Sequence, residues 1–362
     1  MPTIAETTVE KVQWVFPEHA GAPGQIHGGR MMEWITHAGT LAAARVARGQ
    51  VVLGAMDDID FLHPVRVGEI AILRAQVEYV GRSSLEVGVR VWAENVATGR
   101  RSITLNSHLV FVSVDEDARP RRMAESITPA DAAEAALVAA ARHRRDQRLA
   151  RFARREPVAR GRSGETELPR TSNSPPTAQA EHAAPATTAP VTTAPAPTTI
   201  RWRSESVRPV LPEDALFGNM MFAGKLLMAL DEAGGILCMR YCRGLVMTAC
   251  LDAMDFHSPI YTHEVVTFTA GLNHVGTSSL EVGVEVLAEK PWAGEVRHAC
   301  TAFLTFVHLG PDLRPRPCPP FTPETPEERR RWDAALVRRE QRLERVKRLK
   351  AAIANERLAE RE

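Results

Sequence analysis

An internal repeat constrains the fold of this chain more than any other feature of its sequence. The segment VFPEHA at Val15 to Ala20 returns as VLPEDA at Val210 to Ala215, and this displacement of 195 residues holds without a gap. Where Tyr79 to Glu94 aligns with His274 to Glu289, 12 of 16 positions are identical. Chance does not produce such a match, so the chain contains two copies of one domain of about 110 residues, a common domain size.

The segments outside the two copies have compositions of their own. Residues 156–199 hold eight of the 25 prolines among Ala, Thr and Ser, which predicts a solvated linker. We predict a helix over 128–155, with Thr128 as its N-cap and Pro129 at its first position, and a second helix over 322–362. Acidic residues interrupt the arginines of both, so we expect helices packed on their own domains or paired as a coiled coil, rather than RNA-binding arms. The expected order is domain 1 (1–125), helical tail (126–155), linker (156–200), domain 2 (201–321) and C-terminal helix (322–362).

Composition and charge exclude several classes of protein. Hydrophobic residues make up 44% and charged residues 25% of the chain, which excludes a wholly disordered or collagen-like protein. The formal charge of +1 gives no bulk attraction to nucleic acid. No apolar run approaches the roughly 18–20 residues of a membrane span, and the first residues lack the pattern of a signal peptide. We therefore expect a cytoplasmic protein without a nucleic-acid partner.

The cysteines are odd in number, and all lie in the second half of the chain. None stands in a CxxC pair or beside a His cluster at zinc spacing, so we expect reduced thiols and no metal. The five are Cys238, Cys242, Cys250, Cys300 and Cys318.

Within one copy the order of patterns indicates an α+β domain. A periodic apolar stretch without proline, from His27 to Gly49, predicts one largely buried helix. Four runs rich in β-branched residues follow and predict strands of one antiparallel sheet, with one face buried against the helix and the other nearer solvent. The sheet is expected to wrap around the central helix. These runs are Val51 to Met56, Ile70 to Tyr79, Ser84 to Asn95 and Arg101 to Val114.

Three ordered motifs then carry a resemblance to a known family. PEHAGAPGQIHGGRMMEWITHAG, DDIDFLHPVRVGE and VGRSSLEVGV, in this order and spacing, resemble the acyl-CoA thioesterase branch of the hotdog-fold superfamily. The duplication resembles the two-domain cytosolic acyl-CoA thioesterases. The resemblance implies two hotdog domains paired within the chain, hydrolysis of fatty acyl-CoA without a metal or other cofactor, and a homo-oligomer, either a trimer of double-hotdog chains or a dimer of such trimers.

The resemblance also places a catalytic carboxylate in the helix. The second copy keeps the family's Asp-Glu-Ala-Gly pattern from Asp231 onward, whereas the first copy has Thr36 at the equivalent position, and threonine cannot act as the general base. The first copy keeps a glycine pair, Gly28 and Gly29, after His27 at the helix start, where backbone N–H groups bind developing negative charge. In the second copy, alanine replaces one of these glycines.

In a hotdog pair each site combines the helix of one copy with the turn of the other. Asp231 then faces the complete turn of the first copy, and Thr36 faces the altered turn of the second. Both losses fall in one composite site, so we expect one working hydrolytic site per chain. The catalytic set is Asp231, Gly28, Gly29 and His27.

The resemblance further suggests where coenzyme A binds. Serine hydroxyls and exposed strand backbone suit the pantetheine amides, and arginine suits the phosphates. Ser278 and Ser279 mark the equivalent turn of the second copy, so the Thr36 site could bind coenzyme A without cleaving it. The coenzyme A set is Gly54, Ala55, Met56, Arg82, Ser83, Ser84, Leu85, Arg145, Phe256, His257 and Ser258, with Arg144 as a further candidate.

One departure from the family keeps alternatives open. The family commonly carries an asparagine shortly before the turn, and this chain has Gly21 and Leu216 there. A slow enzyme, a different orienting group or a catalytically silent acyl-CoA sensor or scaffold would each fit this loss. A dehydratase of the same fold is a further alternative, although the His and carboxylate order of those enzymes is not seen.

Overall fold

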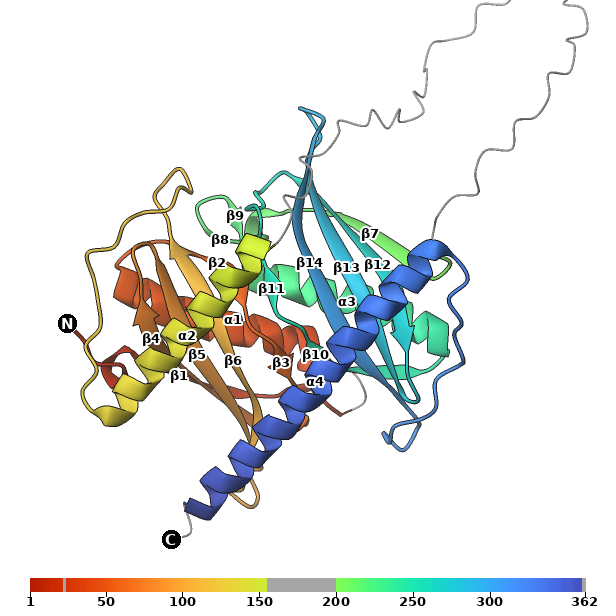
Figure 1. The fold of residues 1–362 in the computed structure, drawn as a ribbon, viewed down its shortest axis with the longest axis horizontal. Helices are drawn as coiled ribbons and strands as arrows, with labels where there is room; N and C mark the ends of the chain where they lie inside the picture. Colours follow the sequence, from red (N-terminus) through yellow and green to blue (C-terminus); the bar gives the residue numbers. More distant parts are fainter. Residues whose placement is uncertain (22–23, 155–199, 360–362) are drawn as a thin grey trace, which may run out of the picture.

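Two long helices form the centre of the molecule in the computed structural model, which describes residues 1–21, 24–154 and 200–359. These helices, α1 (Gly28–Ala47) and α3 (Ala223–Cys242), confirm the helix predicted in each copy and begin and end at positions 195 residues apart. They pack against each other at the centre of the molecule (Figure 1). The predicted linker at 156–199 lies outside the described residues, and the proposed domain limits stay predictions.

Each copy contributes most of one antiparallel six-stranded sheet. The first sheet has the order β1-β4-β5-β6-β2-β11 and the second the order β3-β10-β14-β13-β12-β7. The four strands predicted per copy are present, and the structure adds an N-terminal edge strand to each sheet. In the first copy the strands are β1 (Val9–Trp14), β2 (Val51–Met56), β3 (Ile59–Asp60), β4 (Ile70–Val80), β5 (Ser84–Glu94) and β6 (Arg101–Ser113). In the second they are β7 (Arg203–Pro209), β10 (Leu245–Leu251), β11 (Met254–Asp255), β12 (Val265–Val275), β13 (Ser279–Lys290) and β14 (Glu295–Leu309), with a small hairpin of β8 (Ala215–Phe217) and β9 (Met220–Met221). Short 3-10 helices cover Ala5–Thr7, Pro17–His19 and Pro212–Asp214.

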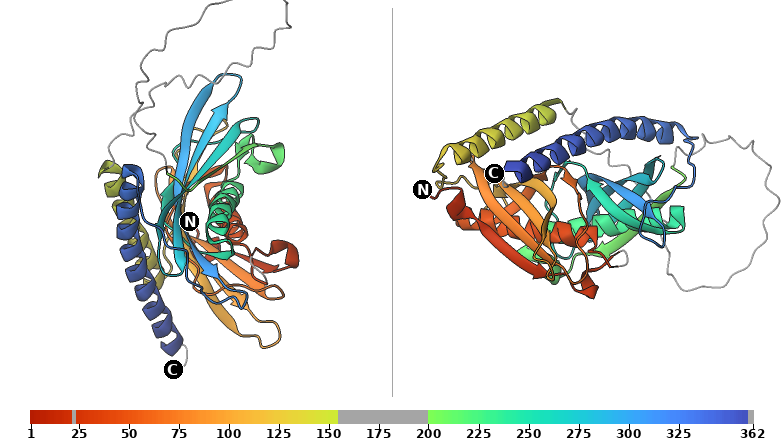
Figure 2. Two further views of the ribbon diagram at one scale, coloured as in Figure 1. Left: turned by 90° about the vertical axis from the view of Figure 1, so that its right-hand side faces the viewer. Right: turned by 90° about the horizontal axis from the view of Figure 1, so that it is seen from below.

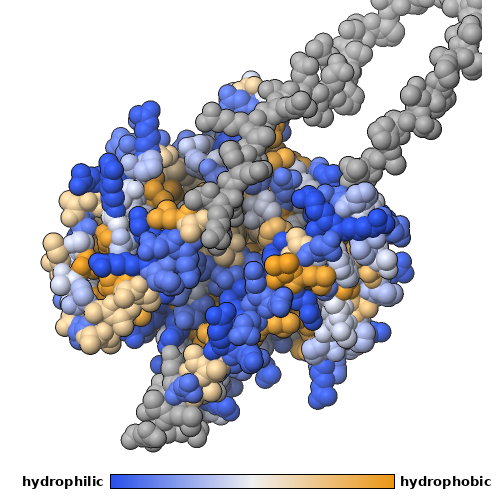
Figure 3. Space-filling view, viewed as in Figure 1, coloured by the Kyte–Doolittle hydropathy of each residue, from blue (hydrophilic) through white to orange (hydrophobic). Residues whose placement is uncertain are grey.

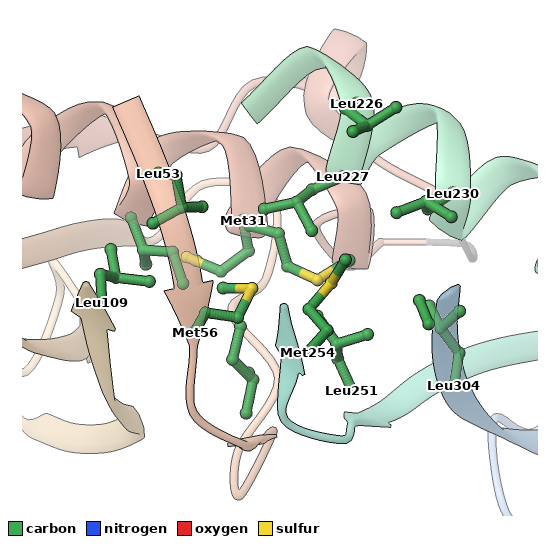
Figure 4. Close-up of a cluster of buried hydrophobic side chains, with 14 of the residues drawn as sticks. Met31, Leu53, Met56, Leu109, Leu226, Leu227, Leu230, Leu251, Met254 and Leu304 are labelled. Carbon is green, nitrogen blue, oxygen red and sulfur yellow. The ribbon is translucent and has the colours of Figure 1, made fainter. Parts of the chain in front are cut away.

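The two copies exchange their shortest strands. Strand β11 of the second copy pairs with β2 through Met254 and Met56, and β3 of the first copy pairs with β10 through Ile59 and Leu251. Around this junction, apolar side chains from both copies pack together beneath α1 and α3 (Figure 4). The core is therefore continuous across the two domains.

The molecule has three layers. Helices α1 and α3 lie on one face of the sheets, and the tail helices α2 (Ala132–Arg154) and α4 (Pro326–Ala359) cover the other face (Figure 2). The predicted α+β plan, in which a sheet wraps around a central helix, is confirmed. The tail helices pack on the sheets of their own copies, as expected, since α2 contacts β4 and α4 contacts β12.

The expectation that the second face of the sheet lies near solvent was wrong at its centre. Glu86 and Glu281, at equivalent positions of β5 and β13, are 1% and 2% exposed beneath the tail helices. Arg144 and Arg148 of α2 pair with Glu86, and Arg338 and Arg342 of α4 pair with Glu281. Each tail helix is thus held on its sheet by a buried carboxylate between two arginines.

Helix α4 also reaches the other copy. Arg345 donates to the Asp60 carboxylate at 2.7 Å and lies 2.8 Å from that of Asp58, both in the first copy. The outer surface over α4 carries mainly hydrophilic side chains, with hydrophobic residues in separate patches (Figure 3). No helix among the described residues is long and apolar enough to cross a membrane.

The first tail helix begins later than its sequence suggests. Thr128 and Pro129 were expected to open it, but α2 begins at Ala132. The Asp131 side chain accepts the backbone N–H of Glu134 at 2.8 Å, which is the N-cap geometry. Glu134 then accepts the N–H groups of Ile4 and Ala5, which ties the helix start to the N-terminal segment. The start of α2 is therefore set by the Asp131 N-cap and by the contact of Glu134 with the N-terminal segment, and not by Thr128 and Pro129.

Candidate active site

A buried carboxylate lies where the two central helices meet. Asp231 of α3 is 1% exposed. Its Oδ2 atom accepts the backbone N–H of Gly29 at the start of α1 (2.8 Å), and its Oδ1 atom accepts the hydroxyl of Thr248 on β10 (2.7 Å). The Nε2 atom of His27 lies 3.4 Å from Oδ2. The structure thus brings together Asp231, His27, Gly28 and Gly29, as expected from the sequence.

The two glycines allow the start of α1 to lie close to both β10 and α3. A Cβ atom at Gly28 would lie 2.5 Å from Thr248 Oγ1, and one at Gly29 would lie 2.9 Å from the backbone of Met228. The Gly29 N–H is already bound to the carboxylate, so it positions Asp231 instead of binding developing charge as we had expected. Gly28 is the first residue of α1, where N–H groups have no acceptor within the helix.

The environment of Asp231 favours its neutral form more than water does. Burial raises the pKa of its carboxyl above the ordinary value, while His27, the Thr248 hydroxyl and the Gly29 N–H act to lower it. A carboxylate with a raised pKa and three polar neighbours in a helix junction has the character of a catalytic base.

The equivalent position of the first copy has lost this chemistry. Thr36 is fully buried, and its hydroxyl donates to the Met32 carbonyl of its own helix at 2.8 Å. Leu53 stands where the other copy has Thr248, and Phe222 stands where the other has His27. The Phe222 ring lies 6.2 Å from that of His37. Both side chains that contact the Asp231 carboxylate, His27 and Thr248, are therefore replaced in this composite site, while Gly29 keeps its counterpart Gly224.

A cavity of about 400 Å³ lies beside this altered site. Its walls include Thr40 of α1, Phe222 and Ala223 at the start of α3, and the strand β2. Gly54, Phe256, His257 and Ser258, all from the predicted coenzyme A set, line it together. The Phe256 N–H donates to the Gly54 carbonyl at 3.0 Å, which fixes this contact between the copies.

These four residues of the predicted coenzyme A set therefore lie on the Thr36 side, whereas we had expected them to share a site with Asp231. The pseudo-twofold arrangement of the two copies explains the difference. Strand β2, which carries Gly54, packs against the helix of its own copy, α1, and α1 carries Thr36 where α3 carries Asp231. Around Asp231 the equivalent contact is made by Phe61, whose N–H donates to the Ala249 carbonyl at 3.0 Å. Ala55 and Met56 are buried, 4% and 0% exposed, and pair with β11.

The remaining predicted residues lie further out. In the β4 to β5 turn Arg82 is exposed and Ser83 is half-buried, Ser84 pairs with Val112 of the cavity wall, and Leu85 is a core residue. Arg145 lies on α2, on the opposite face of the sheet from α1 and α3 (Figure 2). Arg144 is held by Glu78 and Glu86. The structure brings neither of the two α2 arginines, Arg144 and Arg145, to Asp231.

Sequence reasoning missed Thr248, which binds the candidate base directly. A signal was present, because Thr248 interrupts the apolar run LVMTACL where the first copy has leucine. This difference between the copies parallels that between Asp231 and Thr36.

The glycine pair gives a direct prediction. Gly28→Ala is expected to lower kcat/KM for a thioester substrate about 100-fold or more, because the new methyl group displaces Thr248 and misplaces the base. The matched control is Ala223→Gly at the equivalent position of the second copy, which is expected to leave kcat/KM close to that of the parent. Steady-state kinetics of both variants test this, and equal effects of the two substitutions would contradict it.

Comparisons with known proteins identify the family of the chain. The model of the Thioesterase superfamily matches residues 23–100 and 218–292. The chain is 26% identical over 326 residues to a protein named cytosolic acyl coenzyme A thioester hydrolase from Mus musculus, covering 88% of this chain and 78% of that protein. It is 40% identical over 146 residues to the uncharacterized acyl-CoA thioester hydrolase YkhA of Bacillus subtilis, covering 40% of this chain and 84% of that protein. It is also 37% identical over 133 residues to protein VdlD of Helicobacter pylori, covering 37% of this chain and 76% of that protein. The chain belongs to the thioesterase superfamily and carries its hotdog domain in two copies.

Proposed function

We propose that this protein is an acyl-CoA thioesterase with one hydrolytic site per chain. The observation that carries the proposal is the buried Asp231, held at 2.8 Å by the Gly29 N–H of the other copy and at 2.7 Å by Thr248. The names of the relatives from Mus musculus and Bacillus subtilis support acyl-CoA as the substrate class. The products are a free fatty acid and coenzyme A.

The proposed reaction uses only groups of this chain. Asp231 accepts a proton from a water molecule as the water oxygen adds to the thioester carbonyl carbon. The C–S bond then breaks, and the proton passes from Asp231 to the leaving thiolate. The Gly28 N–H at the start of α1 and the imidazole of His27 face the developing oxyanion. No metal or other cofactor takes part in these steps.

His27 is proposed to take the place of the family's missing asparagine. A Cβ atom at Gly21, the asparagine position, would lie 2.7 Å from His27 Cδ2. The imidazole therefore fills the space that an asparagine side chain would need. It is 30% exposed and lies 3.4 Å from the Asp231 carboxylate, so it can contact both substrate and base.

Coenzyme A is proposed to reach Asp231 past Ala249 and the segment from Phe61 to His63, which mirror Gly54 and the segment from Phe256 to Ser258. The cavity beside Thr36 is proposed to bind acyl-CoA without cleaving it. The expected assembly is still a homo-oligomer of double-hotdog chains, and the name of the mammalian relatives supports a cytoplasmic location.

The test is an assay of free thiol released from acyl-CoA esters of increasing chain length. The proposal expects steady turnover of at least one chain length without added metal. Equilibrium binding of the same esters is measured in parallel. Tight binding without thiol release at any length would overturn hydrolysis and favour an acyl-CoA sensor.

The raised pKa of Asp231 predicts the acid limb of the pH profile. The base works only when ionised, so kcat/KM is expected to fall with decreasing pH at a midpoint above the ordinary aspartate pKa of about 3.9. Thr248→Val removes a hydrogen bond that lowers this pKa, so the midpoint is expected to move to higher pH. Leu53→Val at the equivalent strand position is expected to leave the midpoint in place. An unmoved midpoint in the Thr248 variant would argue against Asp231 as the titrating base.

A further inference from the structure

Three residues with metal-binding side chains meet at the end of α3, although no sequence motif joins them. Cys242 is the last residue of α3, His308 lies near the end of β14, and Cys318 lies in the segment that leads to α4. One ligand atom from each lies within 4.8 Å of the others. Zinc bonded to two thiolates at about 2.3 Å holds the sulfurs about 3.8 Å apart, so small side-chain rotations would complete the set.

The repeat makes this cluster specific to the second copy. The equivalent positions of the first copy are Ala47, Ser113 and Met123, and none of these side chains is a metal ligand of the cysteine or histidine kind. The backbone is the same in both copies, because Met123 N–H donates to the Arg82 carbonyl and Cys318 N–H to the equivalent Thr277 carbonyl. The three positions at which the copies differ, Cys242, His308 and Cys318 in the second copy, therefore lie next to one another in the folded chain.

The first copy also shows what fills this place without such ligands. There the Arg121 guanidinium donates to the Ser113 hydroxyl and to the Ala47 carbonyl at the end of α1. In the second copy the His308 imidazole occupies the equivalent space, next to Gly244.

The imidazole is oriented by its backbone partner. His308 is 4% exposed, and its Nδ1 atom lies 2.9 Å from the Pro317 carbonyl. A carbonyl can only accept, so Nδ1 carries the proton and Nε2 presents its lone pair, the arrangement typical of metal-binding histidines. Cys242 also lines a surface cavity of about 480 Å³ with Tyr241, Pro319 and Phe321. The cluster is therefore next to open space on its Cys242 side.

We propose that Cys242, His308 and Cys318 bind one thiolate-preferring divalent cation, with Zn²⁺ as the best fit, and that the fourth coordination position opens to this cavity. Both cysteines bind as thiolates, so two protons leave when the metal enters. The bound ion would connect the end of α3, the end of β14 and the segment that leads to the C-terminal helix.

The test titrates the reduced, chelator-treated full-length protein with Zn²⁺ and with Co²⁺. We expect one equivalent per chain, a thiolate-to-cobalt charge-transfer band in the ultraviolet, and a higher Tm with Zn²⁺, because a ligand of the folded state stabilises it. The triple variant Cys242→Ala, His308→Ser, Cys318→Met carries the residues of the first copy, which that copy already accommodates. It is expected to fold and to lose all three signals.

Two further proteins keep the result decisive. Cys318→Ser removes one half-buried ligand and is expected to weaken Zn²⁺ binding at least 10-fold even if the triple variant does not fold. Cys300→Ala removes a cysteine outside the cluster and is expected to bind as the parent does. Unchanged binding in the Cys318 variant or no stoichiometric binding by the parent would overturn the site. So would a Cys242 to Cys318 disulfide, seen as a mass lower by two hydrogens in parent protein purified without reductant.

Discussion

Asp231→Asn is expected to lower kcat for acyl-CoA hydrolysis by about 100-fold to 10,000-fold, the range associated with loss of a general base. The amide keeps the shape of the carboxylate and fits the same space between Gly29 and Thr248, but it cannot accept a proton from water. The free-thiol assay on parent and variant measures the effect. Thr36→Val, at the equivalent position of the other copy, is the matched control and is expected to retain the parent's rate.

Stability measurements distinguish this loss from misfolding. Because the folded state raises the Asp231 pKa, the ionised carboxylate costs stability once the pH exceeds its pKa in the unfolded chain. The asparagine variant avoids this cost, so its unfolding free energy at neutral pH is expected to be no lower than the parent's. Parent-like turnover by the variant would remove Asp231 from the mechanism, whereas lost activity with lost folding would point to a structural role.

Glu281→Ala is expected to destabilise the second domain by about 3–5 kcal/mol, the cost of breaking a buried ion pair from one side. The Glu281 carboxylate is 2% exposed and accepts from Arg338 at 2.5 Å and from Arg342 at 2.8 Å. Its removal takes away the carboxylate that Arg338 and Arg342 of α4 share. Urea unfolding and the thermal midpoint measure the change.

Two comparisons make this prediction specific. Glu285→Ala changes an exposed residue four residues further along β13, on the same face, and is expected to alter stability by no more than about 0.5 kcal/mol. Combining Glu281→Ala with an apolar replacement of Arg338 is expected to recover part of the loss, since Arg338 then leaves no unpaired charge and Arg342 keeps its pair with Asp252 at 2.6 Å. A change below about 1 kcal/mol for Glu281→Ala alone would mean that the pair behaves like an exposed one.

The parts of the fold that depend on local pattern could be predicted from the sequence. The helix from Gly28 to Ala47 and the strand from Val51 to Met56 follow from apolar periodicity, which is a property of neighbouring residues. The partners of Glu86 could not be predicted, because alternation alone does not say whether a second layer covers the polar face. The arginines that pair with it stand about 60 residues further along the chain.

The same division holds for the site. The difference between Asp231 and Thr36 is visible in the aligned copies, and it is enough to predict one carboxylate per chain. Which strand residues surround that carboxylate depends on the pseudo-twofold packing of α1 against α3. Because of this packing, Gly54 and the segment from Phe256 to Ser258 line the cavity on the Thr36 side, away from Asp231.

The sequence by itself determined the duplication, because a repeat at a fixed displacement is visible without reference to space. The resemblance of its motifs to a known family then predicted the domain type and Asp231 as the one carboxylate at this helix position. Only the tertiary structure decided which residues meet. It placed Thr248 against Asp231, and it brought Cys242, His308 and Cys318 together from three separate segments. The physical reason is that hydrogen bonds and metal coordination depend on distances of a few ångströms, which chain folding sets between residues of any sequence separation.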